Sequence, residues 1–181
     1  MLAQSTNTTI DAVEVEENCC LQLNENIEGS GWSNRINIFH ADILQFMPEG
    51  LYDFVISNPP FYENQLQSPD AAVNLARHTD FLNLSGLFKK ASQFITSGGE
   101  FFLLIPFYRL EECLETAAIH HFFVQHLAVV RHSNQHKPFR AMLRMKVNPV
   151  EGTNETIDVY GPEGKYSSRF KNLLSPFYLK V

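Results

Sequence analysis

The sequence lacks long hydrophobic runs and has only three cysteines among its 181 residues. No apolar stretch approaches the roughly 18 residues of a membrane span, and residues 1–6 lack the basic and apolar segments of a signal peptide. The cysteines, at positions 19, 20 and 113, have neither zinc-site nor disulfide-framework spacing. We therefore expect a cytoplasmic protein with reduced thiols, no membrane segment and no metal site.

The composition is that of an ordinary folded protein. Hydrophobic residues make up 44% and charged residues 19% of the chain, and fifteen phenylalanines supply aromatic core material. We expect one domain over residues 1–181, with a core over 1–150 and a C-terminal extension over 151–181. Oligomeric state does not follow from these features.

Basic residues are scarce in the first 130 positions, which hold 5 Lys and Arg against 16 Asp and Glu. The balance reverses in residues 131–181, with 9 basic against 4 acidic residues. Residues 131–146 contain no acid at all. They are read either as a solvated basic segment or as a phosphate-contacting surface, and the candidate RNA-binding residues are Arg131, Lys137, Arg140, Arg144 and Lys146.

The hydrophobic pattern predicts alternating strands and helices. Apolar residues predict strands over 9–15, 35–39, 52–57, 100–105, 122–131 and 140–148. Helical spacing predicts helices over 16–28, over 84–95 with Ser97-Gly98-Gly99 as its stop, and around 110–118. A loop is expected from Tyr62 to about Asp80, and a polar connection over 151–155. This order predicts an α/β fold with a mostly parallel sheet and helices on both faces.

Polar side chains lie at the ends of three of the predicted strands: Glu14, Asp42 and Asn58. An acid at a strand end often caps the next helix, so each residue alone is a weak signal. Ligands bind at the carboxyl ends of parallel strands. Three such residues at successive strand ends predict one binding crevice.

The most informative segment is Asn58-Pro59-Pro60-Phe61, which ends the predicted strand 52–57. Two prolines fix the backbone and remove two N–H donors, so carbonyls can point at a ligand. The Asn58 amide both donates and accepts hydrogen bonds, and Phe61 offers a flat apolar face. This combination fits a planar amine held for methyl transfer. The alternative, a simple proline turn, would need a reason for prolines beside a central strand.

These four residues resemble motif IV of the class I S-adenosylmethionine-dependent amino-methyltransferases, which methylate adenine N6, cytosine N4 or a glutamine amide. More of the chain resembles the bacterial tRNA1(Val) adenine-N6 methyltransferase family. The matching segments are residues 10–14, 52–62, 76–78, Tyr160-Gly161-Pro162, Tyr166-Ser167 and Phe177-Tyr178-Leu179-Lys180. The resemblance implies a Rossmann-like sheet, S-adenosylmethionine as cofactor, and a tRNA substrate methylated at an anticodon-loop adenine.

The resemblance also implies residue roles. Glu14, with neighbouring Val15, would bind the cofactor ribose, and Asp42 and Ile43 would contact its adenine. Asn58 and the carbonyl of Pro59 would accept from the target amine and lie beside the cofactor. Pro60 would hold the turn and Phe61 would stack on the target base. Arg77-His78 is expected either to touch substrate or, more simply, to anchor its loop.

The sequence departs from this family in one respect. Family members carry an Asp/Glu-x-Gly-x-Gly motif on the first strand, and no such motif precedes residue 10. We expect a chain that lacks the first strand and most of the first helix, so that the strands of Glu14 and Asn58 lose the neighbour between them. Weak cofactor binding and marginal folding are the expected consequences. Micromolar binding in a calorimetric titration with S-adenosylmethionine would contradict them.

Two other functions fit parts of the pattern. Glutamine N5-methylation of a translation factor uses the same Asn-Pro-Pro turn but has no need of the basic segment 131–146. A catalytically silent RNA-binding fragment agrees with the missing glycines and disagrees with the intact residues 58–61. Charge reversal at Arg140 and Arg144 is expected to abolish methylation of RNA and to leave methylation of a protein glutamine unaffected.

Overall fold

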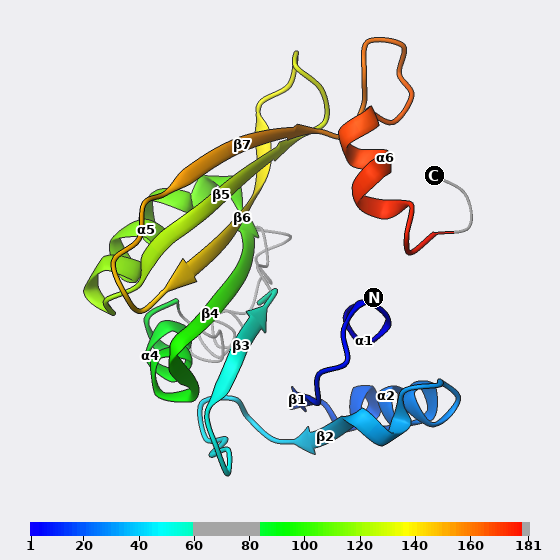
Figure 1. The fold of residues 1–181 in the computed structure, drawn as a ribbon, viewed down its shortest axis with the longest axis vertical. Coiled ribbons are helices and arrows are strands. Elements are labelled where there is room, and N and C mark those ends of the chain that lie inside the picture. Colours follow the sequence, from blue (N-terminus) through cyan, green and yellow to red (C-terminus); the bar gives the residue numbers. More distant parts are fainter. Residues whose placement is uncertain (60–83, 179–181) are drawn as a thin grey trace, which may run out of the picture. The chain divides into compact units, whose positions relative to one another are not determined.

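The computed structural model describes residues 1–59 and 84–178. By the proximity of their Cα atoms, these residues divide into two compact units, Met1–Glu49 and Gly50–Val181. Each unit has its own β-sheet (Figure 1). The single domain expected from the sequence stays a prediction.

The first unit pairs two parallel strands beside one long helix. Ile10 faces Ile36 and Glu14 faces His40 across the strand pair. Arg35 anchors the N-terminal segment of this unit, because its guanidinium donates hydrogen bonds to the carbonyls of Ala3, Thr6 and Thr8 at 2.7–3.0 Å. The elements are α1 (Leu2–Ser5), β1 (Ile10–Glu14), α2 (Glu17–Glu28), η1 (Ser33–Arg35) and β2 (Ile36–His40).

The second unit is a five-stranded sheet in the order β3-β4-β6-β5-β7. Strand β6 runs antiparallel to β4 and β5, while β3, β4, β5 and β7 run parallel to one another. The elements are β3 (Tyr52–Ser57), α4 (Leu84–Phe94), β4 (Ile95–Pro106), η2 (Phe107–Arg109), α5 (Leu110–Ile119), β5 (Phe123–Arg131), β6 (Pro138–Lys146), β7 (Thr153–Asp158) and α6 (Ser168–Leu174).

Aromatic side chains fill the core between this sheet and helices α4 and α5. Phe88 and Phe101 are fully buried, and their ring centroids lie 5.3 Å apart at an edge-to-face angle. Phe122 completes the group, 5.5–5.6 Å from both rings. On the sheet side, the core contains three residues of β6: Ala141, Leu143 and Met145. This packing confirms the helix predicted around residues 84–95 and the apolar face expected for it.

Helix α4 ends and strand β4 begins earlier than the sequence predicts. Ile95, expected on the helix, begins β4, and the predicted helix stop at residues 97–99 lies inside that strand. The register shifts here, since Tyr52 faces Ile95 while Phe54 faces Glu100. A Cβ at Gly99 would lie 2.5 Å from Ile95 Cγ1 and 3.0 Å from the Asp53 carbonyl oxygen, so the glycine allows strand pairing rather than ending a helix.

The C-terminal part is more regular than expected. Residues predicted as a polar connection, 151–155, contain the start of β7, which pairs with β5 from His126–Thr153 to Arg131–Asp158. Helix α6 follows, and the Ser167 hydroxyl caps it by accepting from the Phe170 N–H at 3.1 Å. The predicted loop from Tyr62 to Asp80, including Arg77-His78, lies outside the described residues.

Candidate active site

Asn58 stands directly after β3, as the sequence predicts. The last residue of that strand, Ser57, faces Leu103 of β4, so the backbone leading to Asn58 is held by the sheet. Asn58 is exposed, whereas Pro59 is buried. A buried, rigid residue after an exposed amide keeps the amide at the sheet edge. Pro60 and Phe61 lie outside the described residues.

Glu14 ends β1 with a fixed carboxylate. The Glu16 N–H donates to Glu14 Oε1 at 2.9 Å, and the Glu14 carbonyl accepts from the Ala41 N–H at 2.9 Å. These bonds lock both the backbone and one carboxylate oxygen. The other oxygen, Oε2, points to no partner among the described residues. A half-buried carboxylate with one remaining acceptor suits a diol such as ribose.

Asp42 has a similar geometry after β2. Its Oδ1 accepts from the Leu44 N–H at 2.8 Å, and its carbonyl accepts from the Gln45 and Phe46 N–H groups at 2.8–2.9 Å. Asp42 and its neighbour Ile43 are both half-buried, whereas Val15 is 64% exposed. The structure therefore brings Glu14 and Asp42 to the carboxyl ends of two paired parallel strands.

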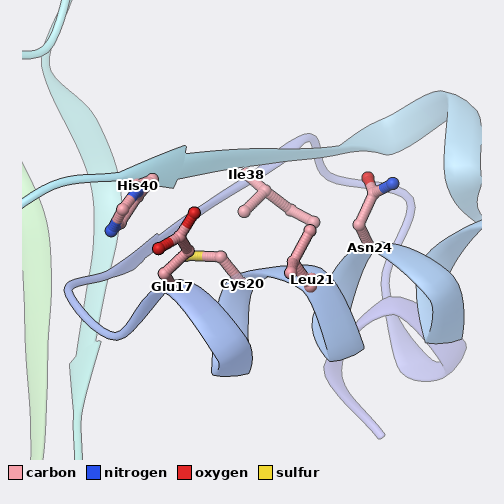
Figure 2. Close-up of a pocket in the computed structure, with 6 residues that line it drawn as sticks. All are labelled: Glu17, Cys20, Leu21, Asn24, Ile38 and His40. Carbon is pink, nitrogen blue, oxygen red and sulfur yellow. The ribbon is translucent and has the colours of Figure 1, made fainter.

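A pocket of about 310 Å³ opens beside these strand ends, between α2 and β2 (Figure 2). Glu17, Cys20, Leu21 and Asn24 line it from the helix, and Ile38 and His40 line it from the strand. The His40 ring bonds the Val15 carbonyl through Nε2 at 3.0 Å. Neither Glu14 nor Asp42 lines the pocket, and we assign it no ligand.

The predicted cofactor residues and the predicted target-amine residue belong to different compact units. Glu14 and Asp42 lie in Met1–Glu49, and Asn58 lies in Gly50–Val181. The three-residue crevice expected from the sequence stays a prediction. In the part of the chain that the structure describes, no group of three His, Cys, Asp or Glu residues is arranged to hold a metal ion.

The basic segment 131–146 is more strongly paired than its composition indicates. Arg144 donates two hydrogen bonds to Glu100, at 2.6 and 2.9 Å, and Lys146 lies 3.3 Å from the same carboxylate. Arg131 forms an ion pair with Asp158. Sequence reasoning missed Glu100 and Asp158 because both lie outside the acid-free segment and meet it only through sheet pairing.

Glu100 is the one residue of this group that is nearly buried, at 6% exposure. Its hydrogen bonds from Arg144 lower the pKa of the carboxyl, and these bonds outweigh burial, which acts in the opposite direction. Because the folded-state pKa lies below the ordinary value of 4.5, Glu100 stabilises the fold above that pH and loses its contribution as pH falls through the lowered value.

We expect the urea midpoint of the wild-type chain to fall more steeply below about pH 4.5 than that of Glu100→Gln. The pKa values of Glu112 and Glu155 are also lowered, through Arg109 and Arg169. The loss of stability at acid pH is therefore expected to be smaller in Glu100→Gln than in the wild type, but not zero. Parallel curves for the two proteins between pH 3 and 7 would contradict the assignment.

Lys137 directly precedes β6 and Arg140 lies near the start of that strand, where it faces Pro106 of β4 and Val130 of β5. Lys137 is exposed, and the Arg140 guanidinium lies 5.8 Å from the centre of the Phe139 ring. Both lie near the end of the sheet at which β5 ends and β6 begins. RNA binding by all five stays a prediction.

Known proteins are similar to this chain in sequence and in fold. The family model described as "Methyltransferase small domain" matches residues 1–140. The chain belongs to this methyltransferase family. A tRNA1(Val) (adenine(37)-N6)-methyltransferase of Parabacteroides distasonis is 31% identical over 186 residues, which cover 100% of this chain and 78% of the relative.

Two solved structures agree with the family assignment at the level of fold. A predicted O-methyltransferase from Agrobacterium tumefaciens superposes with a TM-score of 0.71 at 14% identity, covering 91% of this chain and 76% of the other. A glycopeptide N-methyltransferase solved with S-adenosylmethionine gives 0.55 at 9% identity, covering 77% and 72%. The methyltransferase resemblance and the predicted α/β fold of class I methyltransferases are thus confirmed. In the described residues no helix is long and apolar enough to cross a membrane.

Proposed function

We propose that this methyltransferase transfers a methyl group from S-adenosylmethionine to N6 of an adenine in tRNA, the anticodon-loop adenine 37 of tRNA1(Val). The observation that carries the proposal is Asn58, an exposed amide that the sheet holds at a strand end, followed by a buried proline. The name of the 31%-identical relative supports the same acceptor. A tRNA substrate agrees with the cytoplasmic location expected from the sequence.

Glu14 and Asp42 fit the nucleoside half of the cofactor. Each carboxylate has one oxygen fixed by a backbone N–H, which leaves the other to accept from ribose hydroxyls or from an adenine amine. Ile43 and Val15 offer apolar surface next to them. When bound, S-adenosylmethionine supplies an electrophilic methyl on a sulfonium, whose departure leaves a neutral thioether and needs no acid.

Asn58 and Pro59 act on the nucleophile. The adenine amine is a poor nucleophile because its lone pair is delocalised into the ring. The Asn58 side-chain oxygen and the Pro59 carbonyl accept from its two N–H groups, which favours a pyramidal nitrogen and stabilises the positive charge that develops on it. The rest of the rate enhancement comes from holding the amine in line with the methyl group.

Phe61 is the residue proposed to stack on the extruded base. Extruding a base costs a few kcal/mol, and an aromatic face returns about 1–3 kcal/mol. Loop adenines in RNA are already partly unstacked, so this cost is smallest there.

The acceptor class is tested by offering the chain two substrates. With labelled S-adenosylmethionine at millimolar concentration, so that weak cofactor binding does not limit the rate, we expect label in unmodified tRNA1(Val) transcript. A translation release factor with an unmodified glutamine should remain unlabelled. Label in the protein substrate alone would replace adenine methylation with glutamine methylation.

A further inference from the structure

Tyr108 is an exposed aromatic residue just beyond the end of β4, and none of the roles proposed so far involves it. The residue is 66% exposed, whereas the other residues from Pro106 to Leu110 are all buried or half-buried. A single exposed hydrophobic side chain is ordinary on a protein surface. The significance of Tyr108 therefore depends on how its segment is held and on what lies beside it.

The backbone on both sides of Tyr108 is fixed by packing. Pro106, the last residue of β4, is fully buried, and Phe107 and Leu110 pack against the hydrophobic core. The Leu110 N–H donates to the Phe107 carbonyl at the end of η2. An aromatic ring on such a fixed segment costs little backbone freedom when a ligand stacks on it.

Arg109 adds a further restraint next to Tyr108. Its guanidinium donates two hydrogen bonds to the Glu112 carboxylate, at 2.6 and 2.9 Å. Glu112 belongs to the first turn of α5, so this ion pair ties η2 to the helix that follows it. The segment thus presents an aromatic ring to solvent from a rigid support.

Tyr108 and Asn58 lie at the same end of neighbouring strands. β3 pairs in parallel with β4, and the two strands lie side by side in Figure 1. Ser57 faces Leu103. Continuing this register by one residue places Asn58 abreast of Leu104, and Tyr108 comes four residues later in the chain. Four residues extend at most about 14 Å and neighbouring strands lie about 4.8 Å apart, so the Cα atoms of Asn58 and Tyr108 are within about 15 Å of each other.

An aromatic ring this close to Asn58 can offset a cost of the proposed reaction. When the target adenine leaves its stack, the base next to it loses a stacking partner. An aromatic side chain can replace that contact with little dependence on base identity. Loops of RNA make such contacts readily, because their bases can be splayed out. A ring that stacks on the flanking base would favour the extruded state of the target.

We propose that the Tyr108 ring stacks on a nucleotide that flanks the target adenine, and so holds the RNA loop in the orientation that brings the adenine to Asn58. This inference rests on the proposed tRNA substrate and adds a specific contact to it. Tyr108 is a positioning residue, because it contacts the RNA but neither the reacting amine nor the cofactor.

Tyr108→Leu tests this role, with Tyr108→Phe as the matched variant. Leucine keeps apolar bulk and removes the stacking face, whereas phenylalanine keeps the face and loses only the hydroxyl. We expect kcat/KM for unmodified tRNA1(Val) to fall about tenfold in Tyr108→Leu and less than about twofold in Tyr108→Phe. The KM for S-adenosylmethionine should be unchanged in both. Ile119→Ala alters a similarly exposed side chain at the other end of α5 and should change neither constant.

Stem-loop RNAs with an abasic site on one side of the target adenine test the contact from the RNA side. At one of the two flanking positions, loss of the base should weaken binding to the wild type about tenfold. The same RNA should bind Tyr108→Leu as well as the intact stem-loop does, because the stacking partner is already missing. Additive losses at both positions would contradict the contact.

Thermal melting checks the fold of each variant. Tyr108 is exposed, so Tyr108→Leu should melt at the wild-type temperature, and Tyr108→Gln replaces it if it melts early. Methylation of tRNA by the wild type with unchanged kcat/KM in Tyr108→Leu, or with an equal loss in Tyr108→Phe, would overturn the stacking role and leave the proposed function standing. A wild-type chain that methylates no tRNA would overturn both.

Discussion

Asn58→Ala should lower the rate of methyl transfer to tRNA by about 100- to 1000-fold at saturating substrate. That is the usual cost of removing one hydrogen-bonding group that acts on developing charge. Alanine removes the side-chain oxygen that accepts from the target amine and leaves only the carbonyl of Pro59. The measurement is single-turnover methyl transfer with labelled S-adenosylmethionine.

Two controls separate chemistry from folding and binding. Asn58 is exposed and has no side-chain partner among the described residues, so the alanine variant should melt at the wild-type temperature and bind tRNA with wild-type affinity. Asn58→Asp keeps acceptor oxygens at the same place and should retain more activity than alanine. Equal turnover by wild type and Asn58→Ala would refute the role given to this residue.

Arg144→Glu should destabilise the fold rather than act on RNA alone. The substitution brings a second carboxylate against Glu100, which is only 6% exposed and now receives two hydrogen bonds from Arg144. Lys146 remains near Glu100 and Arg144 itself is partly exposed, so we expect a loss of about 2–3 kcal/mol, below the cost of a fully buried broken pair.

Urea unfolding at pH 7 measures this loss. Lys137→Glu makes the same change of charge at an exposed turn position and should alter stability by less than about 0.5 kcal/mol. If Arg144→Glu is as stable as Lys137→Glu, the pairing with Glu100 does not support the fold. Charge reversal at Arg144, which the sequence indicates as a test of RNA binding, is therefore ambiguous, and Lys137 is the better position.

Local patterns in the sequence predict most of the elements. Helix α4 has its apolar residues at helical spacing, and β4 contains a continuous apolar run in which Phe101, Leu103 and Ile105 are buried, so both were predictable. Gly99 was misread because a glycine after a helical pattern ordinarily ends the helix, whereas here it permits close contact with Asp53. Strand β7 was missed because its polar residues Thr153–Glu155 pair at the sheet margin and have no apolar alternation.

The same distinction, between local sequence patterns and contacts made only on folding, applies to the residues of the candidate site. Asn58, Glu14 and Asp42 were predictable because each is at or near the end of a strand in the sequence, and in the structure Glu14 ends β1 while Asp42 and Asn58 follow β2 and β3. Partners that meet only through folding were not: Glu100 with Arg144 across β4 and β6, and Tyr160 with Tyr166 across a turn. The net charge of a segment predicts a charged surface only when the residues that pair with its side chains are known.

Nucleoside analysis of tRNA is the decisive test of the proposed adenine methylation. Unmodified tRNA1(Val) is incubated with this chain and isotopically labelled S-adenosylmethionine, digested, and examined by mass spectrometry before and after cleavage into fragments. We expect labelled N6-methyladenosine, confined to the anticodon-loop fragment and strongly reduced for Asn58→Ala. Label on another base or another atom of adenine, or tRNA left unlabelled while a protein glutamine is methylated, would contradict it.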